Sequence, residues 1–483
     1  MKEHLPLYIF IIYILILLIV CIRIIINTTT PSKGLAYLLL VISFPVVGII
    51  FYLSVGLNYR KKKLYQKKIL IDEKAFPEIN ERKQLHSQKV LAKHKDTLGN
   101  FYPMLNLLKD KSFSSDNNTV QLYINGENKF PAIIDSLKAA KHHIHIEYYI
   151  YENDTIGNEI AELLIAKAQE GVKVRFIYDD LGSKNIRSNF VKKLQKAGVE
   201  AFPFYKINFI HFANRLNYRN HRKIIVIDGT TGFVGGINVS DKYINTSKNK
   251  LFWRDTHLKI VGTSVLNLQF TFLTDWNFCS KQNIAFSQDY FPIVKEEKKY
   301  GNDLVQIVAS GPDSDHPNIM YSLVQTILLA KKELLITTPY FIPNSSFINA
   351  IKIAALSGVK VTLLVPGISD SFIVNVTSQS FYQELLEVGV KIYKYNKGFV
   401  HAKTLVCDQE IAVVGTANLD IRSFDLNFEI NAITYDTIIA QQLSNQFYED
   451  LQESIQLEIV KWNNRPVYVK FMEKVFRLFS SLM

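Results

Sequence analysis

Two stretches of the chain carry the same residues at the same spacing. Asn220-His221-Arg222-Lys223-Ile224-Ile225-Val226-Ile227-Asp228 is followed by Gly235-Gly236-Ile237-Asn238. Val400-His401-Ala402-Lys403-Thr404-Leu405-Val406-Cys407-Asp408 is followed by Gly415-Thr416-Ala417-Asn418. Each stretch has a histidine, a lysine two residues later, an aspartate five residues after that, and then a glycine and an asparagine. A lone His-x-Lys would mean nothing, but two matches of this length indicate an internal repeat.

The spacing within each stretch suits chemistry at a phosphodiester. Residues 224–227 and 404–406 are typical of strands, and alternation along a strand puts the histidine and lysine of each motif on one face. If the motifs meet across the repeat interface, one pocket holds two histidines, two lysines and two asparagines. Cations and amides stabilise phosphate oxygens, while one histidine attacks phosphorus and the other protonates the leaving alcohol. The lysines supply the charge that a metal would otherwise give, and no metal or cofactor is expected.

Around the motifs a second pattern repeats. Residues 170–174 and 357–361 share a Gly-Val-Lys-Val sequence, and each follows a predicted helix, 160–169 and 347–356 respectively. Each helix ends at a glycine before a β-branched strand, and residues 196–199 and 387–390 show the same transition. Glycine-valine strand starts occur in many α/β proteins, but here three features recur in the same order. The sequence predicts an α/β fold of two tandem repeats, 116–300 and 301–483, forming a pseudo-dimer after a basic linker at 59–115.

The N-terminal region, residues 1–58, reads as a two-helix transmembrane hairpin. Leu5–Ile26 is almost wholly apolar and Leu35–Leu57 has no charge; about twenty such residues cross a bilayer. The alternative is a signal peptide followed by a buried helix, but no small-residue cleavage site follows the first span. The cations of Arg60-Lys61-Lys62-Lys63 place the following domain in the cytoplasm by the positive-inside rule.

The composition limits the classes of binding partner but does not identify one. The formal net charge is +12 and 48% of the residues are hydrophobic. Such a balance suits a nucleic acid or an acidic lipid surface. The three cysteines, Cys21, Cys279 and Cys407, are too widely spaced to indicate a disulfide framework or a zinc site.

The paired motifs resemble those of the phospholipase D superfamily from about residue 119 to the end of the chain. The resemblance implies one metal-free active site, a phosphohistidine intermediate, and attack by the N-terminal histidine, His221. It implies the following catalytic set: His221, Lys223, Asp228, His401, Lys403 and Asp408. Asn238 and Asn418 match phosphate-contacting positions. The aspartates of such motifs more often serve structure than proton transfer.

The resemblance also implies carboxylates that orient the histidines. Glu429, in Asn427-Phe428-Glu429, is one of them. Its first-repeat counterpart is less clear; Asp255 is the candidate, although its distance from His221 along the chain is six residues longer than that of Glu429 from His401. Which histidine Glu429 reaches is left open by the sequence.

A finer resemblance is to bacterial cardiolipin synthases. It rests on the two spans and on residues 232–238, 272–276 and 338–343. It implies a multi-pass enzyme of the bacterial cell membrane that condenses two phosphatidylglycerol molecules into cardiolipin and glycerol, with anionic lipid and no nucleic acid as partner. A hydrolytic phospholipase D, a membrane-tethered nuclease and a non-enzymatic scaffold are the alternatives, and the oligomeric state is open.

The C-terminal tail has two readings. Val467, Phe471, Val475, Leu478 and Leu482 recur at near-helical spacing, with basic residues elsewhere around the helix. The tail is either a basic amphipathic helix at a membrane interface or a helix that docks on the second repeat.

Overall fold

The computed structural model describes residues 5–28, 31–53, 77–109, 112–206, 218–246, 251–292 and 298–480. The chain divides into two compact units, which are Met1–Leu70 with Ile207–Tyr218, and Ile71–Lys206 with Arg219–Met483. The basic stretch at 60–63 lies outside the described residues.

Among its described residues, the N-terminal unit contains one helix long and apolar enough to cross a membrane. Helix α1 (Leu5–Asn27) contains the apolar stretch Leu7–Asn27. The second predicted span is not one helix, because α2 (Pro31–Ser43) ends before Pro45 and α3 (Pro45–Phe51) begins there. Proline has no N–H to donate, and its ring clashes with the preceding turn. Residues 54–57 of that predicted span lie outside the described part.

The first repeat of the large unit forms a seven-stranded sheet, β2-β10-β8-β7-β3-β4-β5. Its elements are β2 (Asn118–Ile124), α7 (Asn125–Lys138), β3 (His143–Tyr148), α8 (Thr155–Gln169), β4 (Lys173–Tyr178), α9 (Asn189–Lys196), β5 (Glu200–Pro203), β6 (Arg219–Asn220), β7 (Lys223–Ile227), β8 (Thr231–Gly235), β9 (Phe252–Arg254), β10 (Thr256–Gly262) and α11 (Val265–Ser280).

The second repeat has the same strand order, β11-β20-β18-β17-β12-β14-β15, with β1 and β21 at the two edges. Its elements are β11 (Val305–Ser310), α12 (Asn318–Leu329), β12 (Glu333–Thr337), β13 (Phe341–Ile342), α13 (Ser345–Leu356), β14 (Lys360–Pro366), α14 (Phe372–Gln379), α15 (Tyr382–Leu386), β15 (Lys391–Tyr395), β16 (Gly398–Val400), β17 (Thr404–Cys407), β18 (Ile411–Gly415), β19 (Leu419–Asp420), α16 (Ile421–Asp425), β20 (Asn427–Thr434), α17 (Thr437–Gln452), β21 (Ser454–Gln456), α18 (Ile459–Asn463) and α19 (Val467–Leu478).

The matching strand orders confirm the predicted α/β repeat. The helices predicted at 160–169 and 347–356 and the strands at 224–227 and 404–406 are all present as α8, α13, β7 and β17. The described part of the predicted linker also folds, as α5 (Pro77–His94), α6 (Tyr102–Leu107) and β1 (Phe113–Ser115). Strand β1 pairs with β11, so this segment completes the second sheet.

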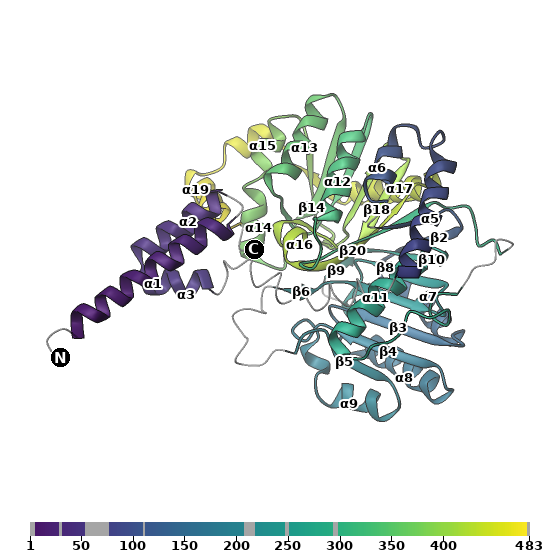
Figure 1. Ribbon diagram of the computed structural model, residues 1–483. Coiled ribbons are helices and arrows are strands. Elements are labelled where there is room, and N and C mark those ends of the chain that lie inside the picture. Colours follow the sequence, from purple (N-terminus) through teal and green to yellow (C-terminus); the bar gives the residue numbers. More distant parts are fainter. Residues whose placement is uncertain are drawn as a thin grey trace. The chain divides into compact units, whose positions relative to one another are not determined.

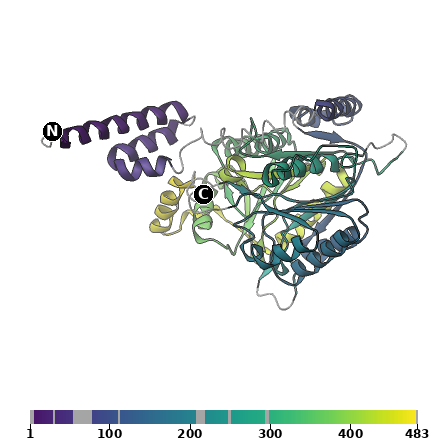
Figure 2. The same cartoon turned by 60° about the horizontal axis from the view of Figure 1, so that its bottom comes forward.

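The two sheets face each other across a shared core (Figures 1 and 2). This core joins apolar residues of both sheets with α11 and α17, among them Ile224, Leu268, Val406 and Leu443. Two further cores lie on the outer faces, one beneath α7, α8 and α9 and one beneath α12, α13 and α15. The sheets are therefore held rigidly at their common seam, where the two motifs lie.

Two short parallel pairings cross the seam. Strand β6 of the first repeat pairs with β20 of the second, and β16 of the second pairs with β9 of the first. Each pairing continues by one hydrogen bond to a motif histidine. The His221 N–H donates to the Phe428 carbonyl at 2.9 Å, and the His401 N–H donates to the Arg254 carbonyl at 2.7 Å. Each histidine is thus anchored by the backbone of the other repeat.

Candidate active site

Glu429 of the second repeat holds His221 of the first. Both carboxylate oxygens lie 2.9 Å from Nδ1 of His221. The carboxylate is fully buried and also accepts hydrogen bonds from the Thr416 hydroxyl and, at 3.2 Å, from the Asn427 amide. An acceptor facing Nδ1 fixes the proton on that nitrogen, which leaves the Nε2 lone pair available for chemistry.

Asp255 of the first repeat holds His401 of the second in the reciprocal arrangement. Its Oδ2 lies 2.7 Å from Nδ1 of His401, and its Oδ1 accepts from the backbone N–H of Thr256. Both carboxylates predicted to orient the histidines therefore contact a histidine, and in each case it is the histidine of the opposite repeat. Chain spacing within one repeat carries no information about a contact that crosses to the other.

The two lysines lie beside the histidines, as strand alternation predicts. Lys223 Nζ donates to the His221 carbonyl at 2.6 Å, and Lys403 Nζ donates to the His401 carbonyl. Lys223 is fully buried and Lys403 nearly so. Their ammonium groups are therefore held in fixed positions.

The charges of the two motifs act on each other. Lys403 lowers the pKa of His221, and both Lys223 and His221 lower that of His401. Asp255 and Glu429 both raise the pKa of Lys403. The charged groups of the two motifs therefore lie close enough together to form one electrostatic site at the seam.

Burial sets the protonation of the site at neutral pH. It is the main reason why the pKa of His221 is lowered to about 4, that of Lys223 to about 7 and that of Lys403 to about 8. Burial, with the charges of Lys403 and Lys223, also lowers the pKa of His401 well below its usual range. Both imidazoles are neutral in the free protein, and an anion in the site would favour the charged lysines.

The two carboxylates differ from each other. Burial raises the pKa of Asp255 to about 6. Burial would also raise the pKa of Glu429, but the facing His221, Lys223 and the Thr416 hydroxyl outweigh it, and the pKa is lowered. Thr416 has no hydroxyl counterpart in the first repeat, where Gly236 occupies the matching position and a Cβ would meet Asp255 Oδ1 at 2.1 Å. Sequence reasoning missed Thr416, although it lies within the quoted motif.

The motif aspartates lie away from the histidines, and we propose a structural role for them in place of the predicted catalytic one. Asp228 follows the last residue of β7, whereas Lys223 is its first, so the strand separates them. The Asp228 carboxylate accepts from the backbone N–H groups of Lys141, His142 and His143 at 2.8–3.0 Å. Asp408 accepts in the same way from Lys331, Lys332 and Glu333, each at 2.8 Å. Both aspartates fasten strand ends.

The two asparagines are buried at the seam. The Asn238 amide donates to the Tyr243 hydroxyl at 2.8 Å, and the Tyr243 ring lies 6.0 Å from that of His401. The Oδ1 atom of Asn418 is buried and has no hydrogen-bond partner among the described residues. The role of both in contacting phosphate stays a prediction.

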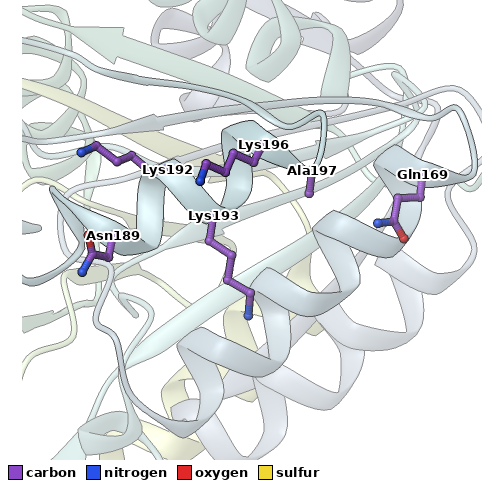
Figure 3. Close-up of a pocket in the computed structure, with 6 residues that line it drawn as sticks. All are labelled: Gln169, Asn189, Lys192, Lys193, Lys196 and Ala197. Carbon is purple, nitrogen blue, oxygen red and sulfur yellow. The ribbon is translucent and has the colours of Figure 1, made fainter.

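A surface pocket of about 560 Å³ lies apart from this constellation. It is lined by Gln169 at the end of α8 and by residues of α9, including Lys192, Lys193 and Lys196 (Figure 3). None of its lining residues belongs to either motif. It offers cations but no histidine or carboxylate.

Comparison with known proteins identifies the family. The family described as cardiolipin synthase, PLD-like domain matches residues 133–264 and 323–451, which contain both motifs. Cardiolipin synthase 2 of Bacillus anthracis is 42% identical over 455 residues, which are 94% of this chain and 87% of that one. This chain belongs to the PLD-like cardiolipin synthase family. The family places it in the phospholipase D superfamily and among the phosphatidyltransferases.

Other similar proteins agree with this family. The cardiolipin synthase of Halalkalibacterium halodurans is 42% identical over 458 residues, covering 94% of this chain and 89% of the relative. The crystal structure of phosphatidylserine synthase from Haemophilus influenzae is 14% identical, with a TM-score of 0.58 over 75% of this chain and 95% of that one. At that identity the structural likeness concerns the fold.

Proposed function

We propose that this protein is a cardiolipin synthase that transfers a phosphatidyl group between two phosphatidylglycerol molecules at the crossed histidine site. The observation that carries the proposal is the reciprocal pairing of His221 with Glu429 and of His401 with Asp255, with a buried lysine beside each histidine. The names of the relatives suggest the product, and the site supplies the chemistry.

In the first step, Nε2 of His221 attacks the phosphorus of one phosphatidylglycerol. The new N–P bond replaces the P–O bond to the glycerol headgroup. The bound phosphodiester anion favours a doubly protonated His401, which keeps its Nδ1 proton on Asp255 and gives its Nε2 proton to the departing glycerol oxygen. Lys223 and Lys403 stabilise the charge on the phosphate oxygens. The phosphorylated imidazole, with its Nδ1 proton, is cationic and faces the buried Glu429 carboxylate.

In the second step, the terminal hydroxyl of another phosphatidylglycerol attacks the same phosphorus. His401 accepts the hydroxyl proton, the P–N bond breaks, and cardiolipin leaves with His221 restored. Water at this step would give phosphatidic acid instead. The acceptor therefore decides between synthase and hydrolase.

The test is turnover of phosphatidylglycerol by the purified full-length protein in the presence of a chelator. We expect cardiolipin and glycerol in equal amounts, with no loss of rate on chelation because the lysines supply the positive charge. Loss of turnover on chelation would contradict the proposed site chemistry. Phosphatidic acid as the main product would identify a hydrolase, and cleavage of DNA without lipid turnover would identify a nuclease.

We also propose that the protein resides in a bacterial cell membrane with the large unit on the cytoplasmic side. The apolar helix α1 supports membrane attachment. The orientation rests on the cations at 60–63, which follow the second apolar segment.

A further inference from the structure

Helix α19 is docked by its charged residues. Glu473 is its one buried residue, and it forms an ion pair with Arg465. Arg477 donates to Glu384 at 2.6 Å and to the Ser380 carbonyl at 3.0 Å, and its guanidinium lies 4.2 Å from the centre of the Phe381 ring. Glu473 and Arg477 of this helix thus face the second repeat.

The opposite face of α19 is apolar and exposed. Val467, Phe471 and Leu478 are 80%, 67% and 79% exposed, and Tyr468 is 70% exposed. An amphipathic helix on a water-soluble domain buries such residues and exposes its charges. Here the pattern is inverted, so this face is built for surroundings that are less polar than water.

Helix α14 extends this apolar face. Phe372 is 65% exposed and Ile373 is 47% exposed, and the Phe372 ring lies 6.4 Å from that of Phe476 on α19. Figure 1 shows α14 and α19 side by side, in agreement with that ring contact. We call the exposed side chains of these two helices the α14–α19 face, and they are Phe372, Ile373, Val467, Tyr468, Phe471, Met472, Leu478 and Phe479.

The α14–α19 face is connected to the active site. The segment before α14 carries Asp370, which accepts a hydrogen bond from the Tyr340 hydroxyl at 2.6 Å. The negative charge of Asp370 also favours the protonated form of Lys403 and so opposes the lowering of its pKa by burial. On the other side, Ser378 of α14 accepts from the backbone N–H of Phe341 in β13, which pairs with β19 directly after Asn418. Two short connections therefore join this face to the catalytic lysine and to the motif asparagine.

We infer that the α14–α19 face inserts into the surface of an anionic lipid bilayer and holds the active site close to it. A lipid substrate then reaches the histidines without its acyl chains crossing water. Lipid is the occupant that the charges favour, because the single acid of α19 is buried and paired, whereas Lys474 is exposed among the apolar residues and can reach lipid phosphates. The expected effect on turnover rests on the proposed function, whereas the insertion of the α14–α19 face into lipid does not.

The direct test is photo-crosslinking of the full-length protein in vesicles of phosphatidylglycerol and phosphatidylethanolamine. A fraction of the lipid carries a diazirine in its acyl chain, and labelled peptides are mapped by mass spectrometry. We expect label on α14 and α19, with α1 as the positive control. The peptide with Ile438 on α17, whose side chain is also exposed at 63%, is the negative control.

The functional test replaces two residues of the face, Phe471→Ser and Leu478→Ser, in one variant. The matched control replaces two exposed apolar residues on other helices, Leu328→Ser on α12 and Ile438→Ser on α17. We expect the first variant to lose about ten-fold in turnover on vesicles, since two large apolar groups no longer enter lipid. Turnover of a short-chain phosphatidylglycerol below its micelle concentration should be unchanged for both variants.

The outcomes separate this inference from the proposed function. Label on α1 but not on α14 or α19 would overturn the inference, as would crosslinks showing that the face is covered by α1–α3 or by a second copy of the chain. An equal loss on vesicles and on the short-chain substrate would also overturn it, because the variant would then have damaged the site. Lipid labelling of the face in a protein that makes no cardiolipin would support the inference and reject the function.

Discussion

At the scale of the residue, the two histidines share a motif but not an environment. His221 faces a glutamate with two additional donors, Thr416 and Asn427, and the pKa of that glutamate is lowered. His401 faces Asp255, whose pKa is raised to about 6. A carboxylate whose pKa is lowered holds its negative charge beside a cationic phosphohistidine better than one whose pKa is raised. This difference supports His221 as the nucleophile.

We therefore expect the phosphatidylated enzyme to carry its label on His221. Acid quench during turnover, followed by mass mapping, should find the adduct on the peptide containing that residue. His221→Ala and His401→Ala should each reduce turnover by several orders of magnitude, because the pair acts as a unit. An adduct on the His401 peptide that survives in His221→Ala would reverse the assignment, and no adduct on either peptide would reject the covalent route.

The lowered lysine pKa values predict a basic limb in the pH profile. Lys223 and Lys403, with pKa values lowered mainly by burial to about 7 and about 8, lose their charge as the pH rises through those values. We expect kcat/KM, which reports the free enzyme, to fall over that range. The limb in kcat should lie at higher pH, because a bound phosphodiester anion favours the protonated lysines. A kcat/KM profile that stays flat from pH 7 to 9 would contradict this account.

At the scale of the element, the strands β7 and β17 each separate a lysine of the active site from an aspartate that supports the fold. Lys223 begins β7 and Lys403 directly precedes β17, and both belong to the site. The aspartate beyond the other end of each strand fastens the start of the neighbouring strand, β3 or β12. Both aspartates have φ near +50°, 51° for Asp228 and 53° for Asp408. Aspartate tolerates this left-handed region better than most residues.

Replacing Asp228 or Asp408 by alanine should reduce stability and spare the chemistry. Three backbone N–H groups lose a charged acceptor, and we expect the free energy of unfolding to fall by about 2–4 kcal/mol. Activity per folded molecule, measured well below the melting temperature, should stay within about a factor of three of the parent. Asp255→Asn is the matched control, since this change removes the partner of His401 and should abolish most activity. Loss of activity in well-folded Asp228→Ala would restore that residue to the catalytic set.

The sequence predicted the elements well, because strand and helix periodicity are local properties. It located β7, β17, α8 and α13 and put each histidine beside its lysine. It did not reveal that Glu429 reaches His221, since that contact depends on how β6 and β20 pair across the seam. It also did not reveal that the helix predicted over Leu35–Leu57 is interrupted at Pro45, because hydropathy averaged over a window does not register a single break.

At the scale of the whole molecule, membrane topology follows from the N-terminal segment. We expect the loop between the two apolar segments to lie outside the cytoplasm, with both ends of the hairpin inside. Thr30→Cys should react with an impermeant thiol reagent added to intact cells, while Ile438→Cys should react only after the membrane is opened. The parent chain with its three native cysteines provides the background. Reaction of Thr30→Cys only from the cytoplasmic side would contradict the topology.

The crossed anchoring of the histidines has a consequence for biosynthesis. When the ribosome has made the chain only as far as β9, His221 has neither its backbone partner Phe428 nor its carboxylate Glu429, because both are encoded some two hundred positions later. Asp255 likewise lacks its partner until His401 has been made. A nascent or truncated chain that ends before β20 therefore lacks the groups that orient His221. The groups that orient both histidines are together only once β20 has been made and has joined the first repeat.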